Sequence, residues 1–496
     1  MRTDCFDQIE KLIKQNWQEF ASDAAEIVQR RVRPHIDRLT TCQTVLVEYP
    51  YVDKVYRNSY YRYYSSKNNE YHRDCIRISL FRDELQPDKF RGQEAESIVP
   101  SNYLGFIILR PTNPSVVGRS AISPSALGVN LDLCLAPIAA SAEGLKVSVN
   151  SFPHSSQDTE TIKCAETTIW SLLEYYSARY QEYQPVLPSD IIQALSASTA
   201  ERQLPSAGLN ITQIAFALKS FGFAPRVYAD GEDSFGFPLS TSIYLESGIP
   251  LVAGLLNSNR TIGHAILIIG REQVDVNKID SLKPRLTNDL SIDSELQSVS
   301  FEYFDYHQLN RKYVVNDDNF PAYQSIEFDR PCIDYPTSEW KSCQISHIAT
   351  PLYHKMYLEA NAARMYFESF LFLGLRIQEK TKSIMTRIFM ASTRSYKHYL
   401  AVESGMQDPI RNVLMAIEMP KFIWICELGS KDLFKNRKVE GFVIIDATET
   451  IVEKQAPILA VSYNGAFSFK PEKRDIQTFD ISLRPFSMYT QNLKSN

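Results

Sequence analysis

The stretch from Phe152 to Ser177 constrains the fold more than any other part of this sequence. No glycine or proline occurs between His154 and Gln184. From Ala165 onward, apolar residues recur at intervals of three and four positions: Ile169, Leu172, Leu173 and Tyr176. This spacing places one apolar stripe along a helix, so a helix with one buried face is predicted here. The polar residues 155–163 lack that period and predict a loop that leads into the helix.

A cysteine stands at the predicted start of this helix. The unpaired amides and the macrodipole of a helix N-terminus favour an anion, and a thiol is a useful nucleophile only as the thiolate. Cys164 is therefore a candidate nucleophile, and the same amides could hold an oxyanion. The simpler interpretation of a cysteine in a helical stripe is a small buried apolar residue. Cys164 consequently needs partners elsewhere in the chain.

A histidine lies at the predicted start of a strand. Residues 250–256 and 265–269 are two apolar runs joined by a polar turn, which predicts two short strands. His264 directly precedes the second run and follows Gly263. An imidazole fixed in this way can serve a cysteine as a general base, although a lone histidine at a strand start is more commonly structural.

A cluster of polar residues follows a further strand-like run at 313–315. Asn316, Asp317 and Asp318 come directly after it, and the end of a strand is a rigid place from which to present a catalytic group. Asp and Asn at such positions also form turns with their own backbone. Any of the three side chains could orient the imidazole of His264, and the sequence does not separate them.

Taken in chain order, these residues resemble the papain-like cysteine peptidases. The C39-like bacterial branch is the most similar, through the segments SQD…CA, GHAILIIG and YVVNDD. The resemblance covers about Ser151 to Arg330. It implies that Cys164 is the nucleophile, that His264 is its general base and later its acid, that Asp317 orients His264, and that Gln157 donates to the oxyanion.

The sequence also departs from the better-known members of that superfamily. Cys164 lies in the context CAETTIW, which differs from the cysteine block of papain and the cathepsins and excludes close kinship with them. Gln157 lies seven residues before Cys164, one more than in papain relatives.

Composition limits the other classes of function. The net charge of -5 argues against a broad nucleic-acid surface. The acidic start of the chain and the lack of any 18-residue apolar run predict neither a signal peptide nor a membrane span. The eight scattered cysteines predict reduced thiols in a cytoplasmic protein. No CxxC, HExxH or phosphate-binding loop occurs, so no metal or organic cofactor is expected.

The flanks predict additional domains, because 496 residues suffice for about three. One amphipathic helix is predicted from Phe6 to Val32, ended by Arg33 and Pro34. β-Branched and aromatic runs then predict strands: Val45 to Tyr49, Tyr60 to Tyr64, Cys75 to Phe81 and Tyr103 to Leu109. Toward the C-terminus, a helix is predicted from Tyr353 to Leu373. Strands are predicted at Phe422 to Glu427, Gly441 to Asp446 and Ile458 to Tyr463.

The sequence therefore predicts an α+β protein with a papain-like two-lobed cysteine peptidase domain at 151–335. A helical segment at 1–42 and a β-rich domain at 43–150 precede this domain, and a mixed α/β domain at 336–496 follows it. The charged insert at 274–300 lies between the candidate histidine and acid.

The expected activity is cleavage of a peptide or isopeptide bond through a Cys164 thioester. The expected partners are a protein or peptide substrate and a regulatory protein, with the flanking domains controlling access or substrate choice. Two alternatives share the same residues. One is acyl transfer or deamidation through the same thioester. The other is a catalytically silent papain-like scaffold in a larger complex.

Overall fold

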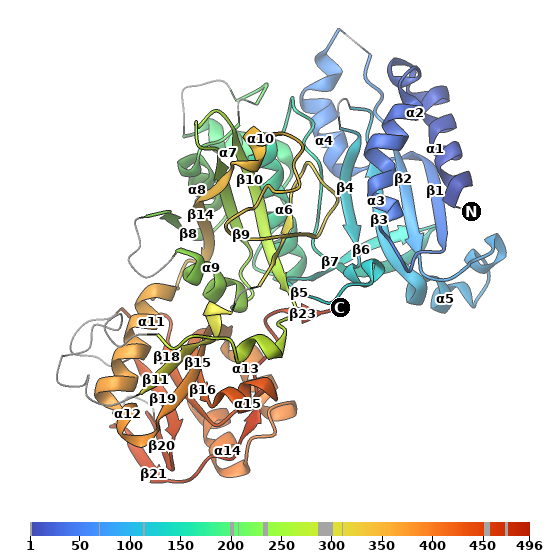
Figure 1. The fold of residues 1–496 in the computed structure, drawn as a ribbon. Coiled ribbons are helices and arrows are strands. Elements are labelled where there is room, and N and C mark those ends of the chain that lie inside the picture. The colour runs from blue at the N-terminus through green and yellow to red at the C-terminus, as the bar shows by residue number, and fades with distance from the viewer. Residues whose placement is uncertain are drawn as a thin grey trace.

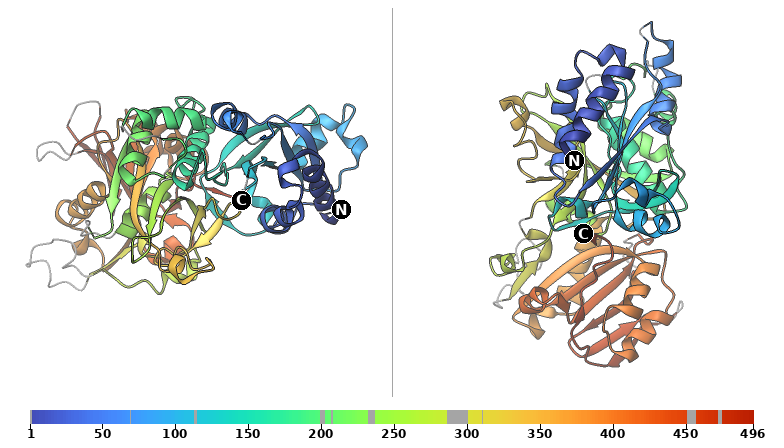
Figure 2. Two further views of the ribbon diagram at one scale, coloured as in Figure 1. Left: turned by 90° about the horizontal axis from the view of Figure 1, so that it is seen from above. Right: turned by 90° about the vertical axis from the view of Figure 1, so that its right-hand side faces the viewer.

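The chain folds around three main sheets. The computed structural model describes residues 2–68, 70–112, 115–198, 203–206, 208–231, 237–285, 301–309, 311–450, 457–471 and 475–496. Within these residues the protein is mixed α/β, with main sheets of four, eight and seven strands. The N-terminal sheet lies beside the central sheet, and the C-terminal sheet lies below both (Figures 1 and 2).

The N-terminal helix is broken, so the prediction of one helix from Phe6 to Val32 is wrong in its continuity. The observed segments are α1 (Arg2–Asn16), η1 (Gln18–Phe20), α2 (Ala24–Ile27), η2 (Val28–Val32) and α3 (Arg33–Asp37). Trp17 leaves the helical conformation, with φ of -113° and ψ of 78°, and its side chain is fully buried. Pro34 does not end the run, because a proline is tolerated in the first turn of a helix.

The N-terminal sheet is antiparallel, in the order β1-β2-β3-β4. Its strands are β1 (Thr44–Tyr51), β2 (Cys75–Phe81), β3 (Tyr103–Leu109) and β4 (Val117–Ile122). The remaining elements of this part are η3 (Tyr64–Ser66), η4 (Pro87–Phe90), α5 (Ala95–Asn102), η5 (Pro124–Leu127) and the hairpin of β6 (Ala136–Ala142) and β7 (Leu145–Ser151). Three of the four strands predicted here are confirmed.

The strand predicted at Tyr60 to Tyr64 is wrong, because most of that segment lies in the helix α4 (Lys54–Arg62). The Asp53 side chain caps this helix by accepting hydrogen bonds from the amides of Val55 and Tyr56. The tyrosine spacing of four residues then places rings on one helical face, with the Tyr56 and Tyr60 centroids 6.3 Å apart. The β propensity of tyrosine was outweighed by the cap and by this packing.

The central sheet follows the order β13-β12-β10-β9-β14-β8, with β5 paired to β10 and β23 paired to β5. Its strands are β5 (Leu131–Leu133), β8 (Phe223–Ala229), β9 (Leu251–Leu256), β10 (Gly263–Glu272), β12 (Tyr313–Asn316), β13 (Gln324–Ile326), β14 (Gln344–Tyr353) and β23 (Lys494–Ser495). The strands predicted at 250–256, 265–269 and 313–315 are confirmed as β9, β10 and β12.

Helices cover the central sheet and include the predicted helix that starts at the candidate cysteine. They are α6 (Cys164–Arg179), α7 (Pro188–Ser196), α8 (Ile211–Ser220), α9 (Phe237–Glu246) and the short α10 (Ser338–Lys341). α6 lies against β10, where the hydroxyl of Thr168 donates to the carbonyl of Ala265 at 3.3 Å. The helix that begins at Cys164 and the strand that carries His264 are therefore in direct contact.

The C-terminal sheet follows the order β11-β15-β16-β18-β19-β20-β21. Its strands are β11 (Glu302–Asp305), β15 (Ser383–Ser392), β16 (Phe422–Gly429), β18 (Gly441–Asp446), β19 (Ile458–Tyr463), β20 (Ala466–Phe469) and β21 (Gln477–Asp480). The other elements are η6 (Val276–Ile279), η9 (Tyr306–Gln308), α11 (Ala360–Ser369), η10 (Phe370–Gly374), α12 (Ile377–Lys380), α13 (Thr393–Val402), α14 (Asp408–Ala416), α15 (Lys431–Lys435), β17 (Lys438–Val439) and β22 (Phe486–Ser487).

The three C-terminal strands predicted from the sequence are confirmed as β16, β18 and β19. The helix predicted from Tyr353 to Leu373 starts too early, because Tyr353 ends β14 and the helix begins at Ala360.

The sheets do not follow the domain boundaries expected at residues 150 and 335. β14 lies beyond 335 and belongs to the central sheet, whereas β11 lies before 335 and belongs to the C-terminal sheet. β5 and β23, from the two flanks, also pair within the central sheet. Strand pairing is decided by contacts between distant segments, which a local pattern does not report. Of the insert expected at 274–300, residues 286–300 lie outside the described residues.

Buried ion pairs join the central part to the C-terminal sheet. Glu246, at the end of α9, accepts from Arg271 of β10, from Arg311 and from Arg387 of β15, at 2.5, 2.9 and 3.2 Å. Arg387 also contacts Glu427 of β16 at 2.9 Å. Burial would raise the pKa of Glu246, but the three guanidinium groups hold it well below its usual range. No helix within the described residues is both long enough and apolar enough to cross a membrane.

Candidate active site

Cys164 occupies the first position of α6, and buried groups hold that helix start in place. The amide of Lys163 donates to Glu166 Oε2 at 3.2 Å, and the hydroxyl of Ser206 donates to the other oxygen of Glu166. Glu166 is 3% exposed, so these contacts are shielded from water. Of the eight cysteines, all of which lie in the described part of the chain, Cys164 alone is not buried. A reagent in solvent therefore reaches Cys164 before the other seven.

The loop before Cys164 is folded around one carboxylate. Asp158 accepts hydrogen bonds from the amides of Glu160, Thr161 and Ile162 at 3.1, 2.7 and 2.9 Å. The buried Arg110, which follows β3 of the N-terminal sheet, donates to the carbonyl of Ser156 at 2.6 Å. These contacts fix Ser156 and Asp158, the two neighbours of Gln157 in the chain. Gln157 itself lines the same cleft as Cys164.

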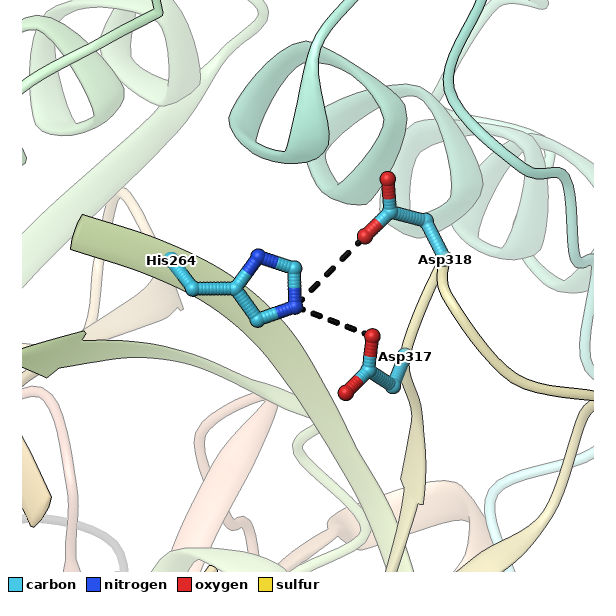
Figure 3. Close-up of side chains that lie close together, drawn as sticks. All are labelled: His264, Asp317 and Asp318. Carbon is cyan, nitrogen blue, oxygen red and sulfur yellow. Dashed lines mark hydrogen bonds and ion pairs between the residues drawn. The ribbon is translucent and has the colours of Figure 1, made fainter. Parts of the chain in front are cut away.

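His264 stands near the start of β10 and faces two aspartates (Figure 3). Its side chain is 2% exposed, and Nε2 lies 2.9 Å from Asp317 Oδ1. Both aspartates lie on the Nε2 side of the ring, which leaves the second ring nitrogen free to face elsewhere. The Cys164 side chain is one of the groups that act on the same imidazole, and the two residues line one cleft. The structure thus brings the predicted histidine and acid into contact and places the predicted cysteine in the same cleft as the histidine.

The charge environment favours the protonated form of His264. Burial alone would lower the pKa of His264, but the charge and hydrogen bond of Asp317 raise it well above its ordinary value of 6.5. The hydrogen bond with Cys164 and the nearby Asp318 act in the same direction. An imidazolium at this position would persist at neutral pH, as a cysteine–histidine ion pair requires.

Asp317 is held as an ionised acceptor. Its Oδ1 also accepts from the amide of Asn319 at 3.0 Å, and its Oδ2 accepts from the hydroxyl of Tyr335 at 2.7 Å. Burial would raise the pKa of Asp317, but the His264 charge and these hydrogen bonds lower it below its ordinary value of 3.8. Because the carboxylate can only accept, Nε2 of His264 must carry the proton in this contact.

The neighbours of Asp317 have different surroundings. Asn316 donates to the carbonyl of Pro153 and accepts from the amide of Tyr323, both at 3.1 Å. These contacts tie its side chain to the backbone of neighbouring segments and not to His264. Asp318 Oδ1 lies 3.6 Å from Nε2 of His264. Within the described part of the chain neither Asp318 oxygen makes a well-formed hydrogen bond. Burial, opposed by His264 and reinforced by Asp317, raises the pKa of Asp318 to about 7.

Two aromatic residues that no sequence pattern indicated cover the histidine–aspartate contact. Tyr335 stacks on Trp340 with ring centroids 4.4 Å apart and an interplanar angle of 8°. Trp340 meets the ring of His264 edge-on, at 5.4 Å and 81°. Both lie in the segment 332–343, which has neither helical nor strand periodicity. Their rings exclude water from the charged pair, which strengthens the electrostatic contact between its members.

A buried histidine outside the predicted set holds the loop that carries Asp317. Nε2 of His154 lies 3.0 Å from the carbonyl of Phe320 and 3.3 Å from that of Asp317. Burial lowers the pKa of His154, so the neutral ring donates a shared hydrogen bond to both carbonyls. Arg38, which follows α3, donates to the carbonyls of Ala322 and Tyr323 at 2.6 and 3.2 Å. The N-terminal part of the chain therefore braces the acid loop.

Three of the four predicted residues line one cleft, and the fourth, Asp317, is buried and contacts His264. The volume of the cleft is about 850 Å³, and Gln157, Cys164 and His264 line it. Apolar side chains form much of the remaining wall: Leu209, Ile211, Ile214, Leu255 and Leu256. Cys164 is only partly buried, and it lines this cleft together with His264. Such a cleft can admit an extended chain with apolar side chains.

The acid side of the site also has donors suited to a cation. His264, Asp317 and Asp318 each offer one ligand atom, and these three atoms lie within 4.8 Å of one another. One nitrogen and two carboxylate oxygens fit several divalent metals. However, Nε2 of His264 must lose its proton to bind a metal, and that proton already occupies the contact with Asp317. These three side chains thus fit proton transfer as they stand, whereas binding a metal would require His264 to give up its proton.

Comparison with known proteins adds no information on the function of the chain. No protein-family model matches the chain, and no curated protein matches it significantly. The resemblance to C39-like peptidases accordingly rests on the few short segments around the cleft.

Proposed function

We propose that the chain is a cysteine peptidase with a papain-like two-lobed core, which cleaves a peptide or isopeptide bond. The observation that carries the proposal is that a buried imidazole, hydrogen-bonded to Asp317, lines the same open cleft as Cys164 at a helix start. In this view α6, α7 and α8 form one lobe, and the sheet that carries His264 and Asp317 forms the other. The nucleophile and its base then face each other across the cleft, as acyl-transfer chemistry requires.

The reaction begins with attack of the Cys164 thiolate on the carbonyl carbon of the substrate. The new C–S bond converts the carbonyl oxygen into an oxyanion, which the amides at the start of α6 and the side chain of Gln157 would stabilise. The C–N bond then breaks, and the leaving amine takes a proton from the His264 imidazolium. This step leaves a thioester on Cys164 and a neutral histidine.

Water completes the cycle. His264 takes a proton from a water molecule, whose oxygen attacks the thioester carbonyl and displaces the thiolate. The products are the carboxylic acid and a regenerated ion pair. Asp317 keeps its negative charge throughout and holds the imidazole in the orientation that presents its other nitrogen to the sulfur.

The flanking parts would control the site through the loops that they brace. Arg110 holds the loop of Gln157, and His154 and Arg38 hold the loop of Asp317. A partner that displaced these contacts would loosen the oxyanion donor and the acid together. This arrangement supports regulation of access or of substrate choice by the N-terminal part.

The test is proteolysis of unfolded protein substrates with mapping of the new termini. We expect the full-length chain to cleave denatured casein and to release free carboxyl and amino termini at each site. Cys164→Ala should abolish cleavage, whereas Cys5→Ala, which changes a buried cysteine of α1, should retain it. Equal cleavage by the Cys164→Ala variant would refute the proposal. If new amide bonds or deamidated glutamines formed in place of free termini, the thioester would serve acyl transfer or deamidation.

A further inference from the structure

We propose that a second cavity, between the central part and the C-terminal sheet, binds an organic anion that has an apolar body. The cavity has a volume of about 640 Å³ and shares no lining residue with the catalytic cleft. Its walls come from the end of α6, the end of β14, the junction of β15 with α13, and the C-terminal segment 491–494. The inference is independent of the chemistry proposed for Cys164.

One part of the cavity wall is apolar and well supported. Tyr176 and Tyr183 meet edge-on at 5.3 Å, and Tyr183 stacks on Phe223 at 4.6 Å and 9°. Met356, Met390 and Met419 complete this wall from the central and C-terminal parts. Stacked aromatic rings give a rigid surface, and methionine side chains adapt to the shape of a ligand.

The rest of the wall is positively charged. Four cationic residues line the cavity, Arg179, Arg394, Lys421 and Lys494, together with one carboxylate, that of Glu182. Glu182 is already paired with Lys421. Within the described part of the chain, no carboxylate lies within ion-pair distance of the other three cations. The cavity therefore carries an uncompensated charge that an anionic ligand would balance.

A helix N-terminus adds to this potential. α13 begins at Thr393 after the cap residue Ser392, whose hydroxyl accepts from the amide of Ser395 at 3.2 Å. The first turn of this ten-residue helix lies in the cavity wall and includes Arg394. The positive end of the helix dipole and the nearby cations act on the same region. A carboxylate or phosphate group is thus placed at the start of α13, with its apolar body against the tyrosines and methionines.

The position of this cavity gives the ligand a structural consequence. α6 runs from Cys164 in the catalytic cleft to Arg179 in the second cavity, and sixteen residues of helix span about 24 Å. A bound anion would contact the far end of the nucleophile helix and the start of α13 at the same time. It would therefore hold the central part and the C-terminal sheet together at their junction, where β23 enters the central sheet (Figure 1).

The test uses the full-length protein and the fluorescent aromatic anion 8-anilinonaphthalene-1-sulfonate. We expect saturable binding that decanoate or decyl phosphate displaces and that decanol, at the same concentration, does not. The more effective competitor identifies carboxylate or phosphate as the preferred head group. The double variant Arg394→Glu and Lys494→Glu should weaken binding of the probe at least roughly tenfold. Near-ultraviolet circular dichroism of the variant should match that of the unmodified protein.

The matched control is Arg62→Glu with Lys470→Glu, which changes the net charge equally at two exposed residues outside the cavity. Its affinity for the probe should stay within about twofold of the unmodified protein, because local charge and not total charge governs the site. Equal losses in the two double variants would overturn the inference. Displacement by decanol as effective as that by decanoate, or the absence of saturable binding, would overturn it as well.

Discussion

Replacing Asp318 by asparagine should make the protein more stable at neutral pH. The Asp318 carboxylate is 6% exposed, makes no well-formed hydrogen bond within the described part of the chain, and lies close to the ionised Asp317. Burial raises its pKa from 3.8 to about 7, with His264 opposing and Asp317 reinforcing the change. The folded protein therefore binds this proton more tightly than the unfolded chain does. Asparagine keeps the shape of the side chain and removes the charge.

The sign and size of the change in the free energy of unfolding follow from proton linkage. Between pH 4 and pH 7 the folded state holds a proton at Asp318 that the unfolded state has lost, so stability falls as pH rises through this window. A rise of roughly three pH units at about 1.4 kcal/mol each gives a penalty of roughly 4 kcal/mol, fully present above pH 7. The unfolding entropy of a chain of this length is about 1 kcal/mol/K, so the thermal unfolding midpoint of Asp318→Asn should exceed that of the unmodified protein by roughly 4 °C.

The assay is differential scanning calorimetry of both proteins from pH 4.5 to pH 8.5. The advantage of Asp318→Asn should grow up to about pH 7 and then stay constant. Asp317→Asn is the matched control with the opposite sign: the pKa of Asp317 is lowered in the folded state, so its charge stabilises the fold above the unfolded-state value of 3.8. Midpoint curves for Asp318→Asn and the unmodified protein that run parallel at every pH would refute the reasoning.

Three further predictions concern the catalytic contacts, each measured as peptide hydrolysis. Tyr335→Phe removes a 2.7 Å hydrogen bond to Asp317 and should lower kcat/KM roughly tenfold; an unchanged value would show that Tyr335 only fills space. Gln157→Ala should lower kcat roughly 100-fold with little change in KM, because an oxyanion donor acts in the transition state; a change confined to KM would remove Gln157 from that role. Treatment with EDTA should leave the rate unchanged, whereas a loss restored by Zn²⁺ would assign His264, Asp317 and Asp318 to a metal.

The parts of the fold that depend on local pattern could be predicted from the sequence. The helix from Cys164 and the strands that carry His264 and precede Asp317 follow from periodicity. The prediction of a single buried face on that helix is wrong, because every residue from Ala165 to Tyr176 is buried. The segment at Tyr60 to Tyr64 could not be judged in this way, since its helix depends on a cap at Asp53 and on tyrosines that pack together. The sequence also did not predict that β11 joins the C-terminal sheet and β14 joins the central sheet, because both depend on pairing across long stretches of chain.

Local sequence pattern likewise predicts some residues of the candidate site and misses others. Cys164, His264 and Asp317 each stand at the end of a predictable element, so chain order alone could group them. The choice among Asn316, Asp317 and Asp318 needed the direction in which each side chain points. Tyr335 and His154 lie outside helices and strands, Trp340 lies in the four-residue helix α10, and all three reach the site only through tertiary contacts. No periodicity or spacing reports such contacts.

The ion pair proposed between Cys164 and His264 can be tested by alkylation. The native protein is treated with iodoacetamide from pH 5 to pH 9, in parallel with the His264→Ala variant, and modification of every cysteine is followed by mass spectrometry. Because Asp317 holds the pKa of His264 well above its ordinary value, Cys164 should react first at pH 6 and should lose that reactivity without His264. Reaction of Cys164 at pH 6 that is equally fast in His264→Ala, or no faster than that of the seven buried cysteines, would contradict the account.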